Sequence, residues 1–382
     1  MKQIVCISTS PWHPVPTRKQ QLMSRIPDAQ ILYFDPPVTY LAPLKDRQAK
    51  EKLRAHRQPG EQISPQLTVY ATPPVLPFFN KYRRINRHNQ KKLARFVRKK
   101  MKEHGFEKPL LWCYSPTSCD LVGRIPHSGL VYDCVDKRSA YGGLMNVGLV
   151  DAEERELAAA ADVCFATAEG LAERLGQVQA HTYMIPNGAN FERFNEASRP
   201  QPVPADFPKT DGPVFGFVGA LQSCIEYGFL ANAAKKRPDW SFVLIGGEKP
   251  DADLAELKTL PNCYFLGLKP NEQLPAYIAQ FDVCLNLFAD NELSKDVSPL
   301  KFYEYLATGK PIVSTKQPKQ TLQYANVIFI AEDAEDFVTQ CERALEDTDP
   351  ERTAARIAEG KACSWDSRVA QIRERLREHG LL

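Results

Sequence analysis

The sequence predicts an α/β protein with two doubly wound domains, and three observations lead to this prediction. Short apolar runs alternate with helical segments, and these runs are rich in Val, Ile, Phe and Tyr, as is typical of parallel strands buried on both faces. The 382 residues exceed what one hydrophobic core usually serves. A proline-rich, unpatterned segment at 195–213 divides the chain into roughly equal halves and indicates a linker.

The expected strands form two sets that match these halves. In the first half they are 4–8, 31–34, 67–70, 110–114, 130–133, 163–167 and 183–185. In the second half they are 214–218, 242–245, 263–266, 283–287, 312–314 and 327–330. We therefore expect a first domain over 1–195, joined by a C-terminal helix over 365–382, and a second domain over 210–362.

The bulk composition is that of an ordinary globular protein, with 43% hydrophobic and 25% charged residues. The ten cysteines lie mostly in apolar runs without a Cys-x-x-Cys pair, which predicts buried reduced thiols and no zinc site. The N-terminus lacks the long apolar core of a signal peptide, and no apolar run reaches membrane-spanning length. We expect a cytoplasmic protein, with peripheral contact at the inner face of the cell membrane left open.

Several catalytic motifs of other α/β enzymes are missing from the sequence. No Gly-x-Gly-x-x-Gly follows the first strand, which argues against a nicotinamide dehydrogenase. The sequence also lacks a Walker phosphate loop and the Gly-x-Ser-x-Gly of an α/β-hydrolase. We expect neither a cofactor nor a divalent metal ion in the active site.

The most informative stretch is 296–315, which reads D-V-S-P-L-K-F-Y-E-Y-L-A-T-G-K-P-I-V-S-T. Ser298 and Pro299 suit the start of a helix, and Gly309 suits its end. Because an expected strand at 283–287 precedes it, this helix begins at the carboxyl edge of a parallel sheet. Helix N-termini at that edge bind phosphorylated ligands in such folds.

Two charged residues of this helix can be interpreted either as ligand-binding residues or as a structural ion pair. Lys301 lies in the first turn, where a cation opposes the helix dipole and therefore indicates a nearby anion such as a diphosphate. Glu304 lies among apolar residues and needs a partner, which could be a ribose diol. The spacing also puts Leu300 on the same helix face. The alternative is a structural ion pair between Lys301 and Glu304, and the residues alone leave both interpretations open.

The stretch resembles the donor-binding signature of retaining glycosyltransferases of the GT-B fold, family 4 type, with its two acidic residues separated by seven others. Further segments resemble the same family, so that the likeness covers nearly the whole chain; they are V-F-G-F-V-G at 214–219, L-P-N-C-Y-F-L-G at 260–267 and I-P-N-G at 185–188. The segments at 131–136 and 161–167 are similar to bacterial polysaccharide and teichuronic-acid-type transferases. The resemblance implies two Rossmann-like domains facing a central cleft. It also implies retaining transfer of a sugar from a nucleotide sugar, which we expect to be UDP-linked, to a glycan or lipid-linked acceptor.

The resemblance also implies roles for individual residues. Glu304 would bind the nucleotide ribose, Asp296 would contact the donor sugar, and the backbone over 298–300 would receive the diphosphate. The implied donor-binding set is Gly219, Gly267, Ser298, Pro299, Leu300, Lys301 and Glu304.

The sequence departs from the family pattern at two places. Asp296 replaces the commoner glutamate, which shortens the reach to the sugar. The basic residues that usually clamp the diphosphate after the Val-Gly turn are replaced by A-L-Q-S-C-I-E at 220–226. Lys301, Lys249 or Arg18 could take over this role.

The first half of the chain offers two further candidates, which with Asp296 make up the expected catalytic set. His13 lies in a Pro-rich loop after the first strand and could contact the acceptor or the diphosphate. Asp136 closes another strand of the same domain and could orient an acceptor hydroxyl. The alternatives are a stiff surface loop for His13 and a turn cap for Asp136 or Asp133. No protein nucleophile is expected.

The segment 81–102 is strongly basic and contains no acidic residue, and an apolar cluster at 75–79 precedes it. Aromatic residues beside a basic helix suit the surface of an anionic membrane. A solvated helix face is the alternative, and nucleic acid is a weaker third interpretation because no nucleic-acid module pattern is found.

Two other functions remain compatible with the sequence. One is a sugar-nucleotide epimerase of the same fold, which would form an isomer without an acceptor. The other is a non-catalytic binding protein that keeps the fold as a scaffold.

Overall fold

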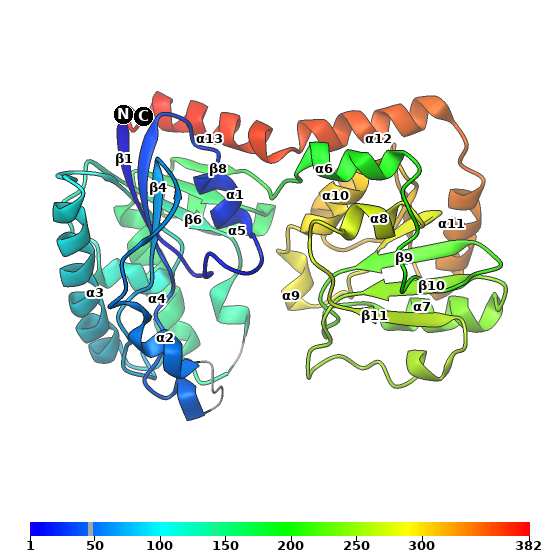
Figure 1. Cartoon of the computed structure of the whole chain (residues 1–382), viewed down its shortest axis with the longest axis horizontal. Coiled ribbons are helices and arrows are strands. Elements are labelled where there is room, and N and C mark those ends of the chain that lie inside the picture. Colours follow the sequence, from blue (N-terminus) through cyan, green and yellow to red (C-terminus); the bar gives the residue numbers. More distant parts are fainter. Residues whose placement is uncertain (45–48, 142) are drawn as a thin grey trace. The chain divides into compact units, whose positions relative to one another are not determined.

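The computed structural model describes residues 1–44, 49–141 and 143–382 (Figure 1). The chain forms two compact units: residues 1–186 with 369–382 make up the first, and residues 187–368 the second. Each unit contains one sheet covered by helices, so the predicted doubly wound α/β class is confirmed. The ten cysteines are free thiols and most are buried.

The first unit contains an eight-stranded sheet in the order β3-β4-β2-β1-β5-β6-β7-β8. All neighbouring strands are parallel except β3, which pairs antiparallel with β4 at the edge. The strands are β1 (Lys2–Ile7), β2 (Ala29–Phe34), β3 (Glu61–Ser64), β4 (Leu67–Tyr70), β5 (Leu110–Cys113), β6 (Gly129–Cys134), β7 (Val163–Ala166) and β8 (Thr182–Met184).

Helices pack on both faces of this sheet. They are α1 (Arg18–Met23), η1 (Ala42–Leu44), α2 (Ala49–Ala55), α3 (Arg83–Glu103), η2 (Pro116–Asp120), η3 (Arg138–Tyr141), α4 (Val147–Ala160) and α5 (Glu169–Gly176). One core joins β1, β2, β5 and β6 to α3, α4 and α5 through side chains such as Val5, Val97 and Leu157. Alternate residues of the strands point to the opposite face, where α1 reaches Asp133.

The second unit contains a six-stranded, all-parallel sheet in the order β11-β10-β9-β12-β13-β14. The strands are β9 (Val214–Val218), β10 (Ser241–Ile245), β11 (Cys263–Gly267), β12 (Val283–Asn286), β13 (Ile312–Thr315) and β14 (Phe329–Ala331). The helices are α6 (Phe191–Asn195), η4 (Glu196–Ser198), α7 (Tyr227–Lys236), η5 (Leu257–Thr259), α8 (Leu274–Ile278), α9 (Glu292–Lys295), α10 (Leu300–Thr308), η6 (Lys319–Tyr324), α11 (Ala334–Leu345), α12 (Pro350–Ala362) and α13 (Trp365–Glu378), whose last ten residues belong to the first unit.

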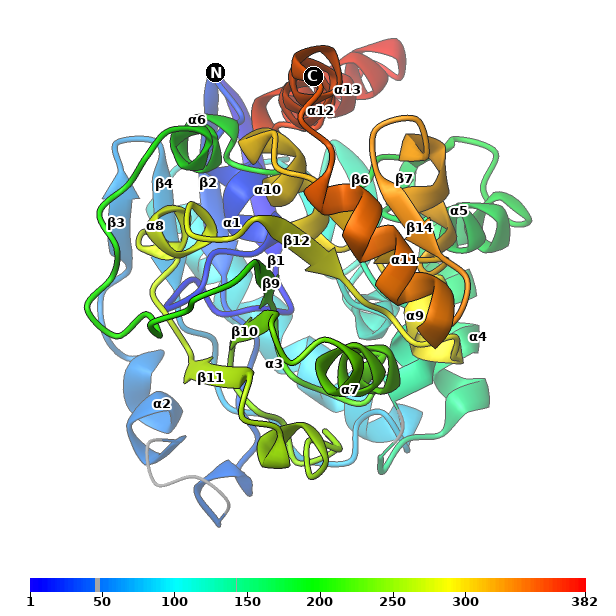
Figure 2. The ribbon, with the colours of Figure 1, turned by 90° about the vertical axis from the view of Figure 1, so that its right-hand side faces the viewer.

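Two separate cores lie on the two faces of the second sheet. Helices α7 and α11 pack on one face, with Leu230 and Phe337 in the core, and α6, α8 and α10 pack on the other (Figure 2). The segment 195–213, which we expected to be a linker, lies within this unit. Phe194 and Ala197 at its start are buried in the second core, so the proline-rich segment continues from packed structure.

Helix α10 is fixed along its length. The Tyr305 hydroxyl accepts a hydrogen bond from the Val218 amide at 2.7 Å, which ties the helix to β9. At its C-terminus the buried Arg356 donates to the Gly309 carbonyl at 2.8 Å, and Arg356 also pairs with Asp347. Gly360 of α12 lies so close to α10 that a side chain there would overlap with its backbone. The position of α10 therefore depends on its contact with α12.

Among the described residues, no helix combines the length and the apolar character that crossing a membrane requires.

The close contact between α10 and α12 predicts that Gly360→Ala loses stability, because the added methyl group would meet the Ala307 backbone. We expect the free energy of unfolding to fall by about 1–3 kcal/mol in urea titrations. Gly176→Ala is the matched control, since Gly176 also lies in a helix but has no atom within 4 Å of the added carbon. Equal stability of both variants would contradict the close packing of α10 and α12.

Candidate active site

Three glycines form the carboxyl edge of β9, β10 and β11 in the second unit. The Gly219 amide donates to the Ile245 carbonyl at 2.9 Å, and the Gly246 amide donates to the Gly267 carbonyl at 2.9 Å. A side chain at Gly246 would overlap with the Gly219 carbonyl oxygen, and Gly267 has a left-handed φ of 65°. The edge that carries the predicted residues Gly219 and Gly267 is therefore bare backbone, which a ligand can approach closely.

Lys249 lies next to the turn in which the family's basic clamp is missing. The Leu221 amide donates to the Gly247 carbonyl at 3.0 Å, and the Lys249 amide donates to the Leu221 carbonyl at 2.8 Å. These bonds pair the segment after β10 with the segment after β9. The Lys249 side chain is exposed, so it is a cation on the strand edge at which a diphosphate is expected.

The start of α10 is held by Asn187. The Asn187 backbone amide donates to the Ser298 hydroxyl at 2.9 Å, and its side-chain amide donates to the Ser298 carbonyl at 2.8 Å. Ser298 and Pro299 are buried, and Leu300 is partly exposed. The helix N-terminus, with its partial positive charge, is therefore fixed in place before any ligand binds.

Glu304 and Lys301 form the ion pair that the sequence left as one of two interpretations. Their Oε2 and Nζ atoms lie 2.5 Å apart, and the Lys301 ammonium also lies over the Phe194 ring at 5.4 Å from its centroid. Glu304 is 7% exposed, and burial raises the pKa of its carboxyl group while Lys301 opposes the rise. A carboxylate offers about four lone-pair sites, so the pair leaves acceptor capacity on Glu304.

Asp296 lies in the turn between α9 and α10 and is partly buried. The structure thus puts it on the same loop as the α10 N-terminus. Its role toward a donor sugar stays a prediction.

Arg18 is buried inside the first unit and pairs with a carboxylate there. Its side chain is 1% exposed, and its Nε lies 3.0 Å from Asp133 Oδ1. Its Nη1 donates to the Ile185 and Pro186 carbonyls at 2.9 and 3.1 Å. Its Nη2 is buried without a hydrogen-bond partner in the described part of the chain. The clamp role of Arg18 stays a prediction, as it does for Lys249 and Lys301.

His13 and Asp136 both lie on the surface of the first unit. The His13 Nε2 atom lies 3.0 Å from Glu61 Oε1, and the two side chains are 64% and 56% exposed. Asp136 follows β6 and is exposed. Burial lowers the pKa of Lys19, and the negative charge of Asp136 opposes this shift. Their proposed contacts with the acceptor stay predictions.

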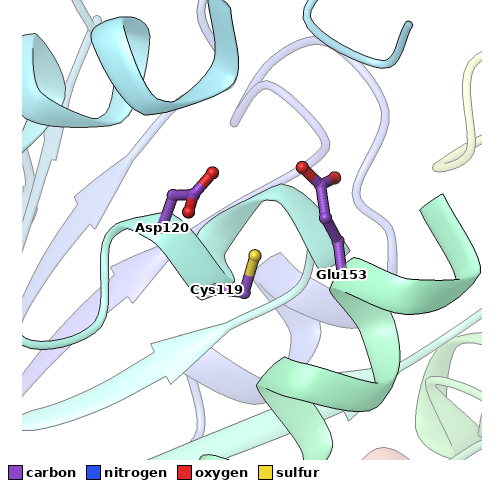
Figure 3. A group of neighbouring side chains, drawn as sticks. All are labelled: Cys119, Asp120 and Glu153. Carbon is purple, nitrogen blue, oxygen red and sulfur yellow. The ribbon is translucent and has the colours of Figure 1, made fainter. Parts of the chain in front are cut away.

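A group of three acidic or thiol side chains lies between η2 and α4 in the first unit (Figure 3). The ligand atoms of Cys119, Asp120 and Glu153 lie within 4.8 Å of one another. Arg83 and Arg87 donate to Asp120 Oδ1, at 3.1 Å in the case of Arg83. Burial raises the pKa of the Cys119 thiol to about 12, so the thiol is protonated at neutral pH. The group is therefore the acidic partner of the basic helix α3.

Two Asp-x-Asp spacings occur in the second unit, at 251–253 and 347–349. Asp251 accepts a hydrogen bond from the Ser223 hydroxyl at 2.6 Å. Asp347 pairs with Arg356, and Asp349 caps the start of α12. Asp251, Asp347 and Asp349 thus take part in interactions that stabilise local structure.

Comparison with known proteins finds a family match within the second unit. Residues 212–347 match the family model described as glycosyl transferases group 1, and this range includes the glycine edge, Lys249 and α10. The second unit carries a group 1 glycosyltransferase domain. The chain is also 28% identical over 175 residues to the putative teichuronic acid biosynthesis glycosyltransferase TuaH of Bacillus subtilis strain 168. That match covers 44% of this chain and 43% of the relative.

Two solved structures resemble the fold of the whole chain. Sucrose-phosphate synthase from Thermosynechococcus elongatus superposes with a TM-score of 0.71 at 15% identity, covering 99% of both chains. Anabaena HepE in complex with UDP and glucose superposes with a TM-score of 0.60 at 17% identity, again covering 99% of both chains. These matches confirm the predicted GT-B fold, and the group 1 match supports the prediction of a transferase.

One buried polar feature was missed from the sequence. Asn86, Asn89 and Gln90 are buried on α3, although we considered this segment only for its charges and apolar stripe. Their spacing with the buried Leu93 and Val97 follows the helical period, which could have placed these amides on the inner face.

The acidic group generates a prediction about pH. Burial, with the nearby Asp120, raises the pKa of Glu153 from 4.5 to about 7. Between these two pH values, Glu153 keeps its proton in the folded protein and loses it in the unfolded chain. Glu153 therefore lowers the free energy of unfolding increasingly as the pH rises from 4.5 to about 7. We expect Glu153→Gln to melt at a higher temperature than the unmodified chain near pH 8, with the difference shrinking toward pH 5.

Glu156→Gln provides a control with the opposite sign. Arg83 lowers the pKa of Glu156, so this carboxylate stabilises the fold at neutral pH. Its removal should lower the melting temperature near pH 8. A Glu153→Gln variant that is destabilised at high pH would contradict the proposed protonation of Glu153.

Proposed function

We propose that the chain transfers a sugar from a nucleotide sugar to a hydroxyl of a glycan or lipid-linked acceptor. The observation that carries the proposal is the combination, inside one group 1 glycosyltransferase domain, of a bare glycine edge with the fixed N-terminus of α10 and Glu304. We propose UDP as the nucleotide, because the similar HepE structure holds UDP and glucose.

The proposed roles follow from the chemistry of each group. Glu304 accepts hydrogen bonds from the ribose diol, while Lys301 turns from the carboxylate toward the diphosphate. The N-terminus of α10 and the exposed Lys249 stabilise the negative charge that develops on the leaving diphosphate. Asp296 contacts the donor sugar. We propose that transfer retains the anomeric configuration and needs no divalent ion or cofactor.

Turnover measurements test this proposal directly. The chain is incubated with several UDP-sugars in EDTA, with and without hydroxyl acceptors, and free UDP and glycoside are followed by mass spectrometry. Acceptor-dependent release of UDP with formation of an α- or β-glycoside of retained configuration supports the proposal. An isomerised UDP-sugar without acceptor would identify an epimerase, and activity that EDTA abolishes and manganese restores would contradict the metal-free mechanism.

The role of Glu304 is tested by Glu304→Ala. If Glu304 binds ribose, the variant loses a charge-assisted hydrogen bond of about 1.5–3 kcal/mol, and calorimetry should show UDP binding at least about tenfold weaker. Glu332→Ala is the matched control in the same unit, because Glu332 forms an exposed pair with Lys316. If UDP affinity is unchanged and the melting temperature falls, Glu304 does not bind ribose and serves only as the structural partner of Lys301.

The basic face of α3 supports a further proposal, that the first unit binds an anionic membrane surface. The cations of this face are exposed, and they are Arg84, Arg87, Lys91, Arg95, Arg98, Lys99 and Lys102. Exposed apolar side chains lie on the segment that precedes α3 and on two loops hydrogen-bonded to it. Leu76, Phe78, Tyr82 and Tyr40 are 40–51% exposed, and Leu144 is 74% exposed. The Tyr40 amide bonds to the Val75 carbonyl, and the Asn146 amide to the Asn80 carbonyl, both within 3.1 Å. Cations beside exposed apolar side chains are the pattern of peripheral membrane binding.

A charge-reversal variant tests this proposal. The variant leaves Arg83 and Lys92 unchanged, because both have partners within the fold. Arg83 pairs with Asp120, and Lys92 donates to the Tyr40 hydroxyl and the Pro74 carbonyl. Replacement of Arg84, Lys91, Arg95 and Arg98 by glutamate should abolish sedimentation with anionic liposomes at low salt, since each cation contributes about 1 kcal/mol near such a surface.

The control variant reverses the same number of exposed charges elsewhere, at Lys209, Lys319, Arg343 and Arg377. It should keep its binding to anionic liposomes. Equal sedimentation of the unmodified chain with neutral and anionic liposomes, or with neither, would leave α3 as a solvated basic helix.

A further inference from the structure

The 288–297 segment, which lies between β12 and α10 and contains α9, carries Asp296. Aspartate has the shorter of the two acidic side chains, by one carbon–carbon bond of about 1.5 Å, so its carboxylate stays close to the backbone. The place from which Asp296 reaches a ligand therefore depends on how this segment is fixed. In the sheet, β12 lies between β9 and β13, so the segments that follow these two strands are its neighbours.

The segment after β9 holds the start and the middle of the 288–297 segment. The Cys224 carbonyl accepts a hydrogen bond from the Ala289 amide at 2.9 Å and one from the Ser294 hydroxyl at 3.4 Å. Ser294 is fully buried, and its own carbonyl accepts from the Val297 amide at 3.3 Å. These bonds extend as far as the peptide group that precedes Val297.

The segment after β13 holds both ends of the 288–297 segment through two glutamine side chains. Near the start, Gln317 Nε2 donates to Asp290 Oδ1 at 3.0 Å. At the end, Gln320 Nε2 donates to the Val297 carbonyl at 2.7 Å. Gln317 is buried and Gln320 is partly buried, whereas Asp290 is exposed. The bond from Gln320 is thus the shorter of the two and lies at the end that carries the acidic residue.

The bond from Gln320 completes the fixation of the backbone directly after Asp296. The Val297 amide bond fixes the peptide group between Asp296 and Val297, and the Gln320 bond fixes the next one, between Val297 and Ser298. Ser298 is held in turn by Asn187. Without the Gln320 bond, the Val297 carbonyl could rotate, and the Asp296 backbone would move relative to the N-terminus of α10.

We propose that Gln320 is a positioning residue for the donor sugar, and that Gln317 assists it from the other end of the 288–297 segment. The Gln320 amide nitrogen bonds to Val297, so it acts on the sugar through the backbone that carries Asp296. Gln320 thereby sets how well the sugar, as distinct from the nucleotide, is bound. The inference rests on the proposed function, because the contact between Asp296 and the donor sugar belongs to that proposal.

Two measurements on the full chain test this inference. Hydrogen exchange followed by mass spectrometry reports on the 288–297 segment, and calorimetry compares the affinity for UDP with that for UDP-glucose, UDP-galactose and UDP-N-acetylglucosamine. We expect Gln320→Met to speed exchange in the 288–297 segment and to leave α10 unchanged. The variant should bind the preferred UDP-sugar up to about tenfold more weakly, the loss of one hydrogen bond, and bind UDP as before.

Three further variants complete the experiment. Gln320→Lys keeps a donor of similar reach and should restore both slow exchange and UDP-sugar affinity. Gln273→Met, at an exposed glutamine of the same unit, is the matched control and should change neither. Asp290→Ala covers the case in which Gln320→Met fails to fold: it removes the partner of Gln317 at an exposed position, and it should also speed exchange in the 288–297 segment.

The outcomes separate this inference from the proposed function. Unchanged exchange in both Gln320→Met and Asp290→Ala, or an equal loss of affinity for UDP and UDP-sugar in Gln320→Met, would overturn the positioning role. Failure of the proposed function has a different result: the unmodified chain would bind no UDP-sugar, while Gln320→Met would still speed exchange in the 288–297 segment.

Discussion

The close contact between α12 and α10 is the constraint on which the second unit's site depends. Gly360 permits two backbones to approach where any side chain would separate them, and Arg356 neutralises the negative C-terminal end of α10 at Gly309. Tyr305 then ties the helix to β9. These contacts fix the helix axis, so its N-terminus and Glu304 are held in position before a ligand arrives. Pre-organisation of this kind avoids reorganisation cost during catalysis.

The first unit depends on buried polar networks more than on a single helix. Arg18 joins β6 to the chain segment at 185–186 through a fully buried ion pair with added hydrogen bonds. Asn86 joins α3 to η2 and α4 by donating to the Thr117 carbonyl and to the carboxyl groups of Asp120 and Glu153. Each network also contains a buried atom without a hydrogen-bond partner in the described part of the chain, Arg18 Nη2 in the first and Glu153 Oε2 in the second. Such partly satisfied networks cost stability, so they act by specifying how their elements are arranged.

The sequence predicted most of the fold because its strands are apolar on both faces. Every expected strand has a counterpart in the two sheets. The edge strand β3 was missed because E-Q-I-S has one apolar residue and pairs on one side only. The linker was expected at 195–213 because prolines interrupt its pattern, whereas burial of Phe194 and Ala197 carries packed structure into it.

Individual site residues were harder to predict, since charge alone does not reveal a partner. Lys301 and Glu304 could be assigned to one helix face, but only their geometry shows that they pair. Arg18 had no sequence neighbour to indicate Asp133, which is 115 residues away. The amides of α3 escaped notice because the surrounding cations dominate the composition of that segment.

The first unit is made from two separated stretches of chain, and this determines when it can form during synthesis. Residues 369–382 contribute Ile372, Leu376 and Leu381 to its buried interior, and Leu381 packs against Gly129 in β6. The second unit, in contrast, is one continuous stretch. On the ribosome the second unit can therefore be finished first, although it is translated later than most of the first. Until the last helix emerges, the first unit exposes the apolar surface that this helix later covers, and such transient exposure favours aggregation of a nascent chain.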